Sequence, residues 1–230
     1  MSMRPGPYNR HPIGPGPLIA LALLVATLWL VFLLDAIGYA YARIGIGRDA
    51  LLGLVAASLV GGMVNIPVAR LRGRVIVHEG EIRVFGVRYR VPVVERSSGT
   101  VLAVNVGGAL IPTGVSLLLA ARDHLWGPAA IGVAAVAAVS FTLARAVPGL
   151  GIAIPGLVPP VVAALAALLL ASRAPAALAY ISGTLGTLIG ADLLHLPRVR
   201  DLGASMVSIG GAGTFDGVFM SGVLAALLVI

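Results

Sequence analysis

The sequence predicts an all-α polytopic membrane protein with about seven transmembrane helices and a small cytoplasmic β-hairpin insertion. Of the 230 residues, 59% are hydrophobic and 11% are charged, and the mean hydropathy is +1.03. A soluble domain carries about 25% charged residues. Several segments of about 20 residues lack any charge, which is the length that crosses about 30 Å of hydrocarbon. An ordinary soluble enzyme or binding domain is therefore excluded.

The charge composition also excludes several classes of site. The net charge of +7 comes from 16 arginines and no lysine, and the chain has no cysteine. Disulfides, thiolate metal sites, iron–sulfur clusters and cysteine nucleophiles are thus excluded. Because the arginines fall between apolar segments, they indicate membrane orientation rather than a nucleic-acid partner. No cofactor is expected.

The chain divides into four parts. Residues 1–17 are rich in proline and glycine and predict a flexible tail. Residues 18–69 hold transmembrane helices 1 and 2, residues 70–99 a β insertion, and residues 100–230 transmembrane helices 3–7. The expected spans are Leu18–Ala40, Ala50–Val68, Thr100–Ala121, Gly127–Leu143, Leu150–Ala171, Pro175–Leu196 and Gly210–Ile230.

Two of these parts are irregular. The fifth span begins GLGIAIPGLVPP, whose prolines and glycines predict an unwound half-helix or a re-entrant element. Residues 70–99 alternate apolar and polar side chains around Gly80 and Gly86, which predicts a β-hairpin or meander. This insertion is expected either to cover the helix ends as a lid or to offer an edge strand to a partner.

The loops predict the topology. Twelve arginines lie on the side of the N-terminus and the β insertion, against four on the other side: Arg43, Arg48, Arg122 and Arg173. The positive-inside rule therefore predicts a multi-pass protein of the cell membrane with a cytoplasmic N-terminus. Its expected partner is the lipid bilayer, and the oligomeric state stays open.

Three aspartates fall within apolar stretches, where each ionisable group indicates a functional site until a partner explains it. Asp35 stands near the end of the first span and is expected to reach water or pair with Arg43. Asp192 precedes the end of the sixth span and Asp216 follows the start of the seventh. At 1.5 Å per residue they lie about 6 and 9 Å from the same face.

Glycines surround both of these aspartates. Gly183, Gly186 and Gly190 recur about one turn apart before Asp192, and SIGGAGTFDG surrounds Asp216. Small residues let membrane helices pack closely, so the two carboxylates can face one another and share a proton. Three interpretations stay open: a hydrolytic dyad, an ion or proton pathway, and a structural hydrogen bond.

The chain resembles a known family along most of its length. The motifs are Asn65-Ile-Pro, Asn105-Val-Gly-Gly-Ala-Leu-Ile-Pro, Ser182-Gly-Thr-Leu-Gly-Thr-Leu-Ile-Gly-Ala-Asp and Gly210-Gly-Ala-Gly-Thr-Phe-Asp-Gly-Val-Phe. Together they resemble an uncharacterised prokaryotic membrane family, the domain-of-unknown-function 1614 group. This resemblance implies no activity.

A shorter resemblance implies a mechanism. Gly213-Thr-Phe-Asp-Gly-Val-Phe is similar to the G-x-G-D helix of presenilin and signal-peptide-peptidase type intramembrane aspartyl proteases. The resemblance implies Asp216 and Asp192 as catalytic residues, Phe219 as the following aromatic, and a transmembrane peptide as substrate. Phe215 stands at the second glycine position and Ala191 at the usual tyrosine. No later span carries the Pro-Ala-Leu motif.

Two asparagines and four histidines complete the candidates. Asn65 and Asn105 are expected within apolar helices, either bonding another helix or lining a pathway with the aspartates and with Gly213 and Phe219. The alternative function is then a proton- or cation-coupled transporter, and a third is a non-catalytic assembly protein. The histidines lie in separate loops, so no metal site is expected. His195 is expected either to tune Asp192 or to be incidental.

Overall fold

The computed structural model describes residues 15–71, 75–84, 87–96, 99–147, 151–170, 173–199, 206–211 and 217–229. The chain forms two compact units, residues 1–37 and residues 38–230. Each is described by itself.

The first unit consists of most of helix α1 (Pro15–Arg43). Residues Leu18–Arg43 have a mean hydropathy of 2.6, and none of the residues in the most apolar stretch is buried. Asp35 is exposed on this helix. An apolar helix of 26 residues is long enough to cross a bilayer. The predicted first span is thus a continuous helix.

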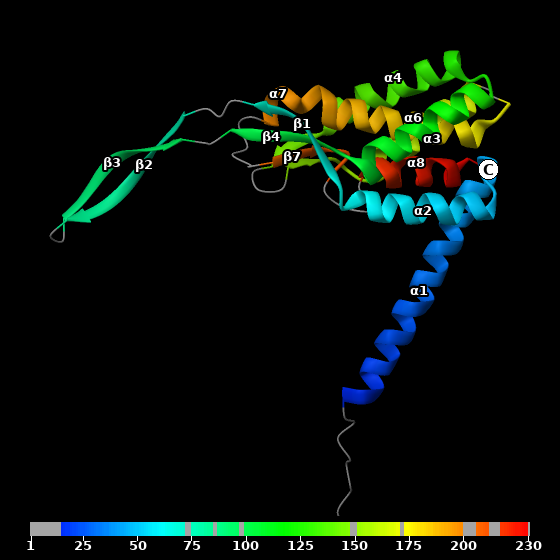
Figure 1. Ribbon diagram of the computed structural model, residues 1–230, viewed down its shortest axis with the longest axis horizontal. Helices are drawn as coiled ribbons and strands as arrows, with labels where there is room; N and C mark the ends of the chain where they lie inside the picture. Colours follow the sequence, from blue (N-terminus) through cyan, green and yellow to red (C-terminus); the bar gives the residue numbers. More distant parts are fainter. Residues whose placement is uncertain are drawn as a thin grey trace, which may run out of the picture. The chain divides into compact units, whose positions relative to one another are not determined.

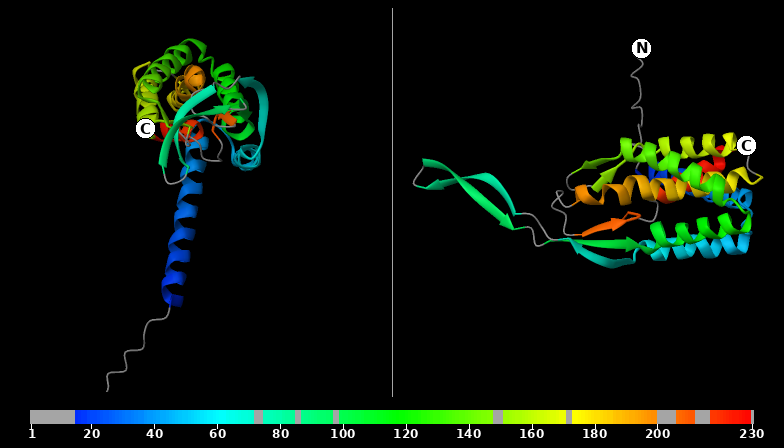
Figure 2. Two further views of the ribbon diagram at one scale, coloured as in Figure 1. Left: turned by 90° about the vertical axis from the view of Figure 1, so that its left-hand side faces the viewer. Right: turned by 90° about the horizontal axis from the view of Figure 1, so that it is seen from above.

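The second unit is a bundle around one central helix, α6 (Pro175–Thr187), in which most residues are buried. Helices α3, α4, α5 and α8 pack against α6, and the view along the bundle shows α6 within their ring (Figure 2). The helices of this unit are α2 (Arg48–Gly62), α3 (Ile111–Arg122), α4 (Trp126–Leu143), α5 (Val158–Leu169), α6, α7 (Leu196–Val199) and α8 (Gly217–Leu228).

Two helices of the bundle carry a π-helical turn. The turn η1 (Val106–Leu110) precedes α3, and the turn η2 (Leu188–Asp192) follows α6. After η2 comes a single 3₁₀ turn, η3 (Leu193–His195). A π turn adds a residue to the helical repeat and is frequent at functional sites.

A three-stranded sheet lies at one end of the bundle, which we call the sheet end (Figure 1). Strand β4 (Thr100–Asn105) is central, with β1 (Asn65–Leu71) antiparallel on one side and β7 (Met206–Ile209) parallel on the other. Two short strands, β5 (Arg145–Val147) and β6 (Gly151–Ala153), pair between α4 and α5.

The predicted β-hairpin is confirmed. Strands β2 (Val75–Val84) and β3 (Val87–Arg96) pair antiparallel from Val75 opposite Arg96 to Val84 opposite Val87. Gly80 lies inside β2 and does not interrupt it. The fifth predicted span is irregular in its first half, as expected, but that half contains the strand β6 instead of an unwound helix. Its helix begins only at Val158, just before Pro159 and Pro160, and has 12 residues, fewer than a spanning helix needs.

The expectation of seven spanning helices is not confirmed. Among the described residues, three helices are long and apolar enough to cross a membrane: Leu18–Arg43, Trp126–Leu143 and Pro175–His195. The other apolar helices have 10–17 residues. At 1.5 Å per residue, 12 residues, as in α5 and α8, reach about 18 Å. The all-α prediction needs the same correction, since the molecule is mostly helical with a small sheet.

The corrections fall on the second, third, fifth and seventh predicted spans. Helix α2 ends at Gly62, so Asn65 begins a strand, and Asn105 ends a strand before η1 begins. Gly210 follows β7 in a turn with φ +81° instead of starting a helix. Hydropathy alone does not separate an apolar strand from an apolar helix, which explains the error.

The opposite end of the bundle is held by two arginines, and we call it the arginine end. Arg122 donates to the carbonyl oxygens of Ile44, at 2.7 Å, and Gly45, at 3.2 Å, just beyond α1. Arg43 donates to the Val229 oxygen, at 2.6 Å, just beyond α8. Helix C-termini leave carbonyl groups unpaired and carry partial negative charge, so both arginines stabilise helix ends.

Arg122 also pairs with Asp123 through two hydrogen bonds of 2.8 and 2.7 Å. This hydrogen bonding lowers the pKa of Asp123. The pair therefore stabilises the folded protein at pH values above the pKa that Asp123 has in the unfolded chain. This stabilisation is lost as the pH falls through the lower pKa that Asp123 has in the folded protein. At neutral pH, Asp123 thus keeps the Arg122 guanidinium oriented toward the carbonyl oxygens of Ile44 and Gly45.

Glycines permit the close helix packing that the sequence predicts. Gly183 faces Ser221 on α8, Gly186 faces Val136 on α4, and Gly190 faces Ala137 on α4. A Cβ atom on Gly107 would overlap the Ser58 oxygen and the Gly62 nitrogen. The backbones therefore touch where these glycines stand.

Gly107→Ala tests this packing against Gly114→Ala on the same segment of chain. The first places a methyl group into backbone of α2, and overpacking costs about 1–3 kcal/mol. The second meets nothing within 4 Å and gains up to about 1 kcal/mol of helix propensity. Thermal unfolding in detergent should show a lower Tm for Gly107→Ala alone. Equal Tm values for the two variants would contradict the packing.

Candidate functional site

Asp192 lies at the junction between the bundle and the sheet. It is the last residue of η2, and its side chain is partly exposed. Its Oδ2 accepts a hydrogen bond of 2.7 Å from the backbone N–H of Gly210. Gly210 and Gly211 both have positive φ, +81° and +76°. The carboxylate therefore holds the glycine turn from which the chain continues toward Asp216.

The π turn changes the direction in which Asp192 faces. Before it, α6 presents Thr187 to α8, and Thr187 Oγ1 donates to Ser221 Oγ at 3.0 Å. In a continuous α-helix, Ala191 would follow Thr187 on that face, one turn later. The wider π turn, closed by i to i+5 hydrogen bonds, instead brings Asp192 toward the face of Thr187.

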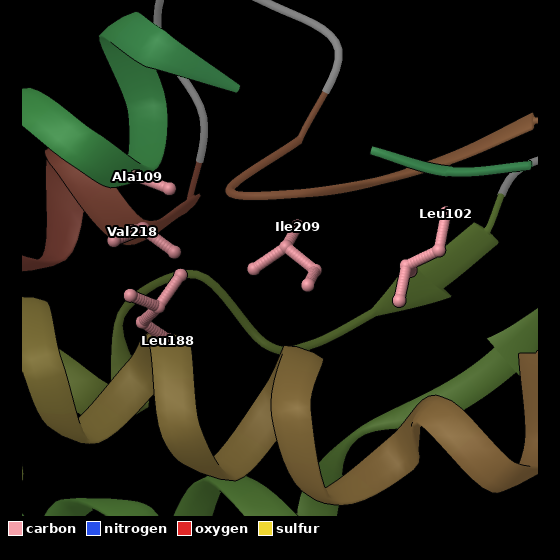
Figure 3. Close-up of a cluster of buried hydrophobic side chains, with 5 residues drawn as sticks. All are labelled: Leu102, Ala109, Leu188, Ile209 and Val218. Carbon is pink, nitrogen blue, oxygen red and sulfur yellow. The ribbon is translucent and has the colours of Figure 1, made fainter. Parts of the chain in front are cut away.

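An apolar cluster fixes the sheet against the helix ends near Asp192. It consists of one buried side chain from each of five elements, β4, η1, η2, β7 and α8: Leu102, Ala109, Leu188, Ile209 and Val218. Figure 3 shows Ile209 between Leu102 and the group formed by Leu188, Val218 and Ala109. Because η2 contributes Leu188, burial of this cluster restrains the turn that carries Asp192.

Asn105 organises the neighbouring strand ends. Its side chain is fully buried and donates to the Gly62 oxygen at 2.8 Å and to Asn65 Oδ1 at 3.1 Å. Its Oδ1 accepts the Gly108 N–H at 2.7 Å. Ser208 of β7 donates to Asn65 Oδ1 at 2.5 Å. One amide thus connects the end of α2, strands β1 and β4, and the start of η1.

Two glycines join this asparagine network to Asp192. A Cβ atom on Gly108 would overlap the Gly210 oxygen, and a Cβ atom on Gly210 would stand 2.6 Å from that of Ala109. The Gly108 N–H binds Asn105, and the Gly210 N–H binds Asp192. We call Asn105, Gly108, Asp192 and Gly210 the glycine junction.

The remaining predicted site residues have different outcomes. Asp216 and Gly213 lie outside the described residues, and α8 is described from Gly217 onward. Phe219 is buried in α8, with 3% of its surface exposed. The structure brings Asn65 and Asn105 together, on paired strands instead of helices. Their mutual hydrogen bond favours a structural role over lining a pathway.

His195 has a larger structural role than an incidental residue at a helix end. It is fully buried, and its Nδ1 lies 3.0 Å from the Gly190 oxygen, which can only accept, so Nδ1–H donates. Its ring stacks near Phe141, with centroids 4.9 Å apart. His195 therefore fixes a carbonyl inside the π turn. Only its position one turn after Asp192 hinted at this role.

Sequence analysis also missed polar residues that carry no motif. Ser208 binds Asn65, and Tyr180, Thr184 and Thr187 form a buried hydroxyl face on α6. Their spacing of four and three residues is a helical repeat and was the available signal. Among the described residues, no group of three histidine or acidic side chains could hold a metal ion.

Comparison with known families gives one match. A family model described as "Protein of unknown function (DUF1614)" matches residues 59–228, which is most of the chain. The match includes the strands, the bundle and the glycine junction. Comparisons with curated proteins and with solved structures find no match.

Asn105→Ala tests whether the amide holds the junction together. It leaves the buried Gly62 oxygen and Gly108 N–H without this partner, and each unsatisfied group costs about 1–3 kcal/mol. Ser116→Ala is the control, because the buried Ser116 hydroxyl bonds only within its own helix, to Pro112. A clearly larger loss of Tm is expected for Asn105→Ala. A smaller loss than in the control would refute the role of Asn105.

Proposed function

This chain belongs to the DUF1614 family of unknown function, and we propose that it is an intramembrane aspartyl protease. In this proposal Asp192 and Asp216 form a dyad that hydrolyses a peptide bond of a membrane-embedded substrate. Several apolar helices fit a location in the membrane, and the activity is our proposal.

The observation that carries the proposal is the antiparallel packing of α6 and α8. Thr187 donates a hydrogen bond to Ser221. Gly183, one turn earlier on α6, contacts both Ser221 and Ala225, and Ala225 lies one turn later on α8. Four residues beyond Thr187 is Ala191, and four residues before Ser221 is Gly217. Asp192 follows Ala191 and Asp216 precedes Gly217, so this register supports two carboxylates at one level.

The Asp192 hydrogen bond gives a second line of support. It binds Gly210, and the segment that contains Asp216 leaves from the next residue, Gly211. Asp216 immediately precedes α8 in the sequence, and α8 packs against α6. The elements on both sides of residues 212–216 therefore contact either Asp192 or α6, which supports a position of Asp216 near Asp192.

Such a pair would work by sharing one proton. Two nearby carboxylates resist double ionisation, so in the working state one holds a proton while the other is ionised. The ionised group takes a proton from water while the water oxygen attacks the peptide carbon. The protonated group gives its proton to the carbonyl oxygen, forming a tetrahedral diol.

Collapse of the diol completes the reaction. The C–N bond breaks, and the departing nitrogen receives the proton that came from water. A diol hydroxyl returns a proton to the other carboxylate. The products are a carboxylic acid and an amine, and the dyad again holds one proton. The short resemblance of residues 213–219 to presenilin-type proteases agrees with this assignment.

The test uses Asp192→Asn and Asp216→Asn in the full chain. An asparagine at position 192 keeps an oxygen that accepts the Gly210 N–H, so the junction is preserved while proton transfer is lost. General acid–base catalysis contributes about 10²–10⁴-fold in rate, and each variant should lose cleavage by such a factor. The assay follows a fluorescent transmembrane peptide with purified protein in detergent, and mass spectrometry locates the cleaved bond.

The matched control is Asp35→Asn, which removes the third aspartate of the apolar stretches, an exposed residue of α1. Its cleavage rate should equal that of the unmodified protein, and all variants should unfold at similar temperatures. Full cleavage by Asp216→Asn would end the proposal. So would unmodified protein that cleaves no helical peptide.

A further inference from the structure

One face of α6 carries hydroxyl groups that the proposed hydrolysis does not use. Tyr180, Thr184 and Thr187 recur at intervals of four and three residues, and each has 2% or less of its surface exposed. Ser221 of α8 adds a fourth hydroxyl, bonded to Thr187. All four lie in the contact between α6 and α8.

These hydroxyls are close together but incompletely paired. Tyr180 Oη and Thr184 Oγ1 make no hydrogen bond of good geometry among the described residues, but the Tyr180 hydroxyl is close enough to the hydroxyls of Tyr41 and Thr184 to interact with both. The Tyr41 and Tyr180 rings meet edge-on, with centroids 6.1 Å apart. A buried polar group without a partner costs about 1–3 kcal/mol. What distinguishes Tyr180 and Thr184 from the equally unpaired Ser182 is that they adjoin the Thr187–Ser221 hydrogen bond in one row between α6 and α8.

Glycine on α8 provides the space for these groups. Gly222 stands against both Thr184 and Tyr180, and its Cβ would overlap Thr184 Oγ1 and approach the Tyr180 ring at 3.2 Å. Side chains three or four residues apart on a helix are about 5–6 Å apart at Cβ. Proton transfer between hydroxyl groups at such a separation requires rotation of the side chains or a bridging water.

The row connects the two ends of the bundle. Tyr41 lies in the last turn of α1, next to the arginine end, and the partly exposed Asp192 lies at the sheet end. Between them stand Tyr180, Thr184 and the Thr187–Ser221 pair. The π turn then brings Asp192 toward the same face. Without that turn the face would end at Ala191, which carries no polar group.

We propose that Tyr41, Tyr180, Thr184, Thr187 and Ser221 form a hydroxyl file that conducts protons between the arginine end and Asp192. Each hydroxyl or bridging water accepts a proton on its oxygen and releases its own hydrogen to the next group. No covalent bond other than O–H changes, and one proton enters as one leaves. Asp192 binds the arriving proton and releases it at the sheet end.

The other titratable groups near this route are few. His195 stands one turn beyond Asp192 but donates to Gly190, and Asp216 belongs to the proposed dyad. At the arginine end, Arg43 binds the Val229 oxygen and the Tyr39 hydroxyl. The route therefore depends on Asp192 as its acid–base group, and the hydroxyls relay protons without holding charge.

The experiment measures proton flux into vesicles of phosphatidylcholine and phosphatidylglycerol that contain the full chain. A trapped pH-sensitive dye reports the flux, driven by a potassium diffusion potential. Thr184→Val keeps the side-chain shape and removes one hydroxyl, and should lower the flux about tenfold, the equivalent of one lost hydrogen bond. Asp192→Asn should abolish flux above the level of empty vesicles.

The matched control is Ser182→Ala on the opposite side of α6. Ser182 is equally buried and also lacks a hydrogen-bond partner among the described residues, but it faces Gly132 of α4. Its loss should leave the flux unchanged. Equal flux through Thr184→Val and the unmodified protein would overturn the file, as would an equal loss in Ser182→Ala. If Thr184→Val does not fold, the double variant Thr187→Val/Ser221→Ala is measured instead, and it too should lower the proton flux about tenfold.

The flux and cleavage assays separate the two proposals. Thr184→Val should lose flux and still cleave peptide, whereas Asp192→Asn should lose both. Flux that follows these expectations without any peptide cleavage supports the file and sinks the protease. Cleavage by a protein that shows no flux above empty vesicles supports the protease and sinks the file.

Discussion

The close approach of α6 to its neighbours determines the rest of the structure. Glycines on both sides of the contacts with α4 and α8 allow close approach, as where Gly183 meets the Ser221 backbone and Gly222 meets the Thr184 side chain. Association of helices in lipid depends on such packing, because lipid tails are as apolar as the side chains. A bundle held this way fixes the level of each α6 residue against α8. The position of Asp192, the hydroxyl face and the start of α8 all follow from that register.

The small sheet also limits how deep its end of the bundle can lie in a bilayer. Strands β1 and β7 are the outer strands of the described sheet, so their outer edges present backbone groups that need partners. Open sheet edges do not occur where lipid tails contact them. The sheet end must therefore reach water or headgroups, or be covered by protein. Asp192 lies at this end, where a carboxylate can exchange protons and water can approach a substrate.

The sequence predicted the close helix contacts better than the positions of the strands. Glycine spacing indicated the contacts of Gly183, Gly186 and Gly190, because glycines at helical intervals in an apolar helix allow another helix to pack closely. The prolines before α5 indicated its late start for an equally local reason. Hydropathy did not locate strands β1, β4 and β7, since their apolar residues extend the apolar runs of α2, α3 and α8. The pairing of Asn65 with Asn105 followed from that sheet and so could not be predicted.

The central claim, that Asp192 and Asp216 stand at one level across α6 and α8, has a direct test because the chain contains no cysteine. The double variant Asp192→Cys with Asp216→Cys is oxidised in membranes, and mass spectrometry measures disulfide formation, which requires Cβ atoms about 3.5–4.5 Å apart. Thr187→Cys with Ser221→Cys is the positive control, and Ser182→Cys with Ser221→Cys is the negative control. Our account predicts that the aspartate positions cross-link as readily as the positive control. Cross-linking no greater than in the negative control would contradict it.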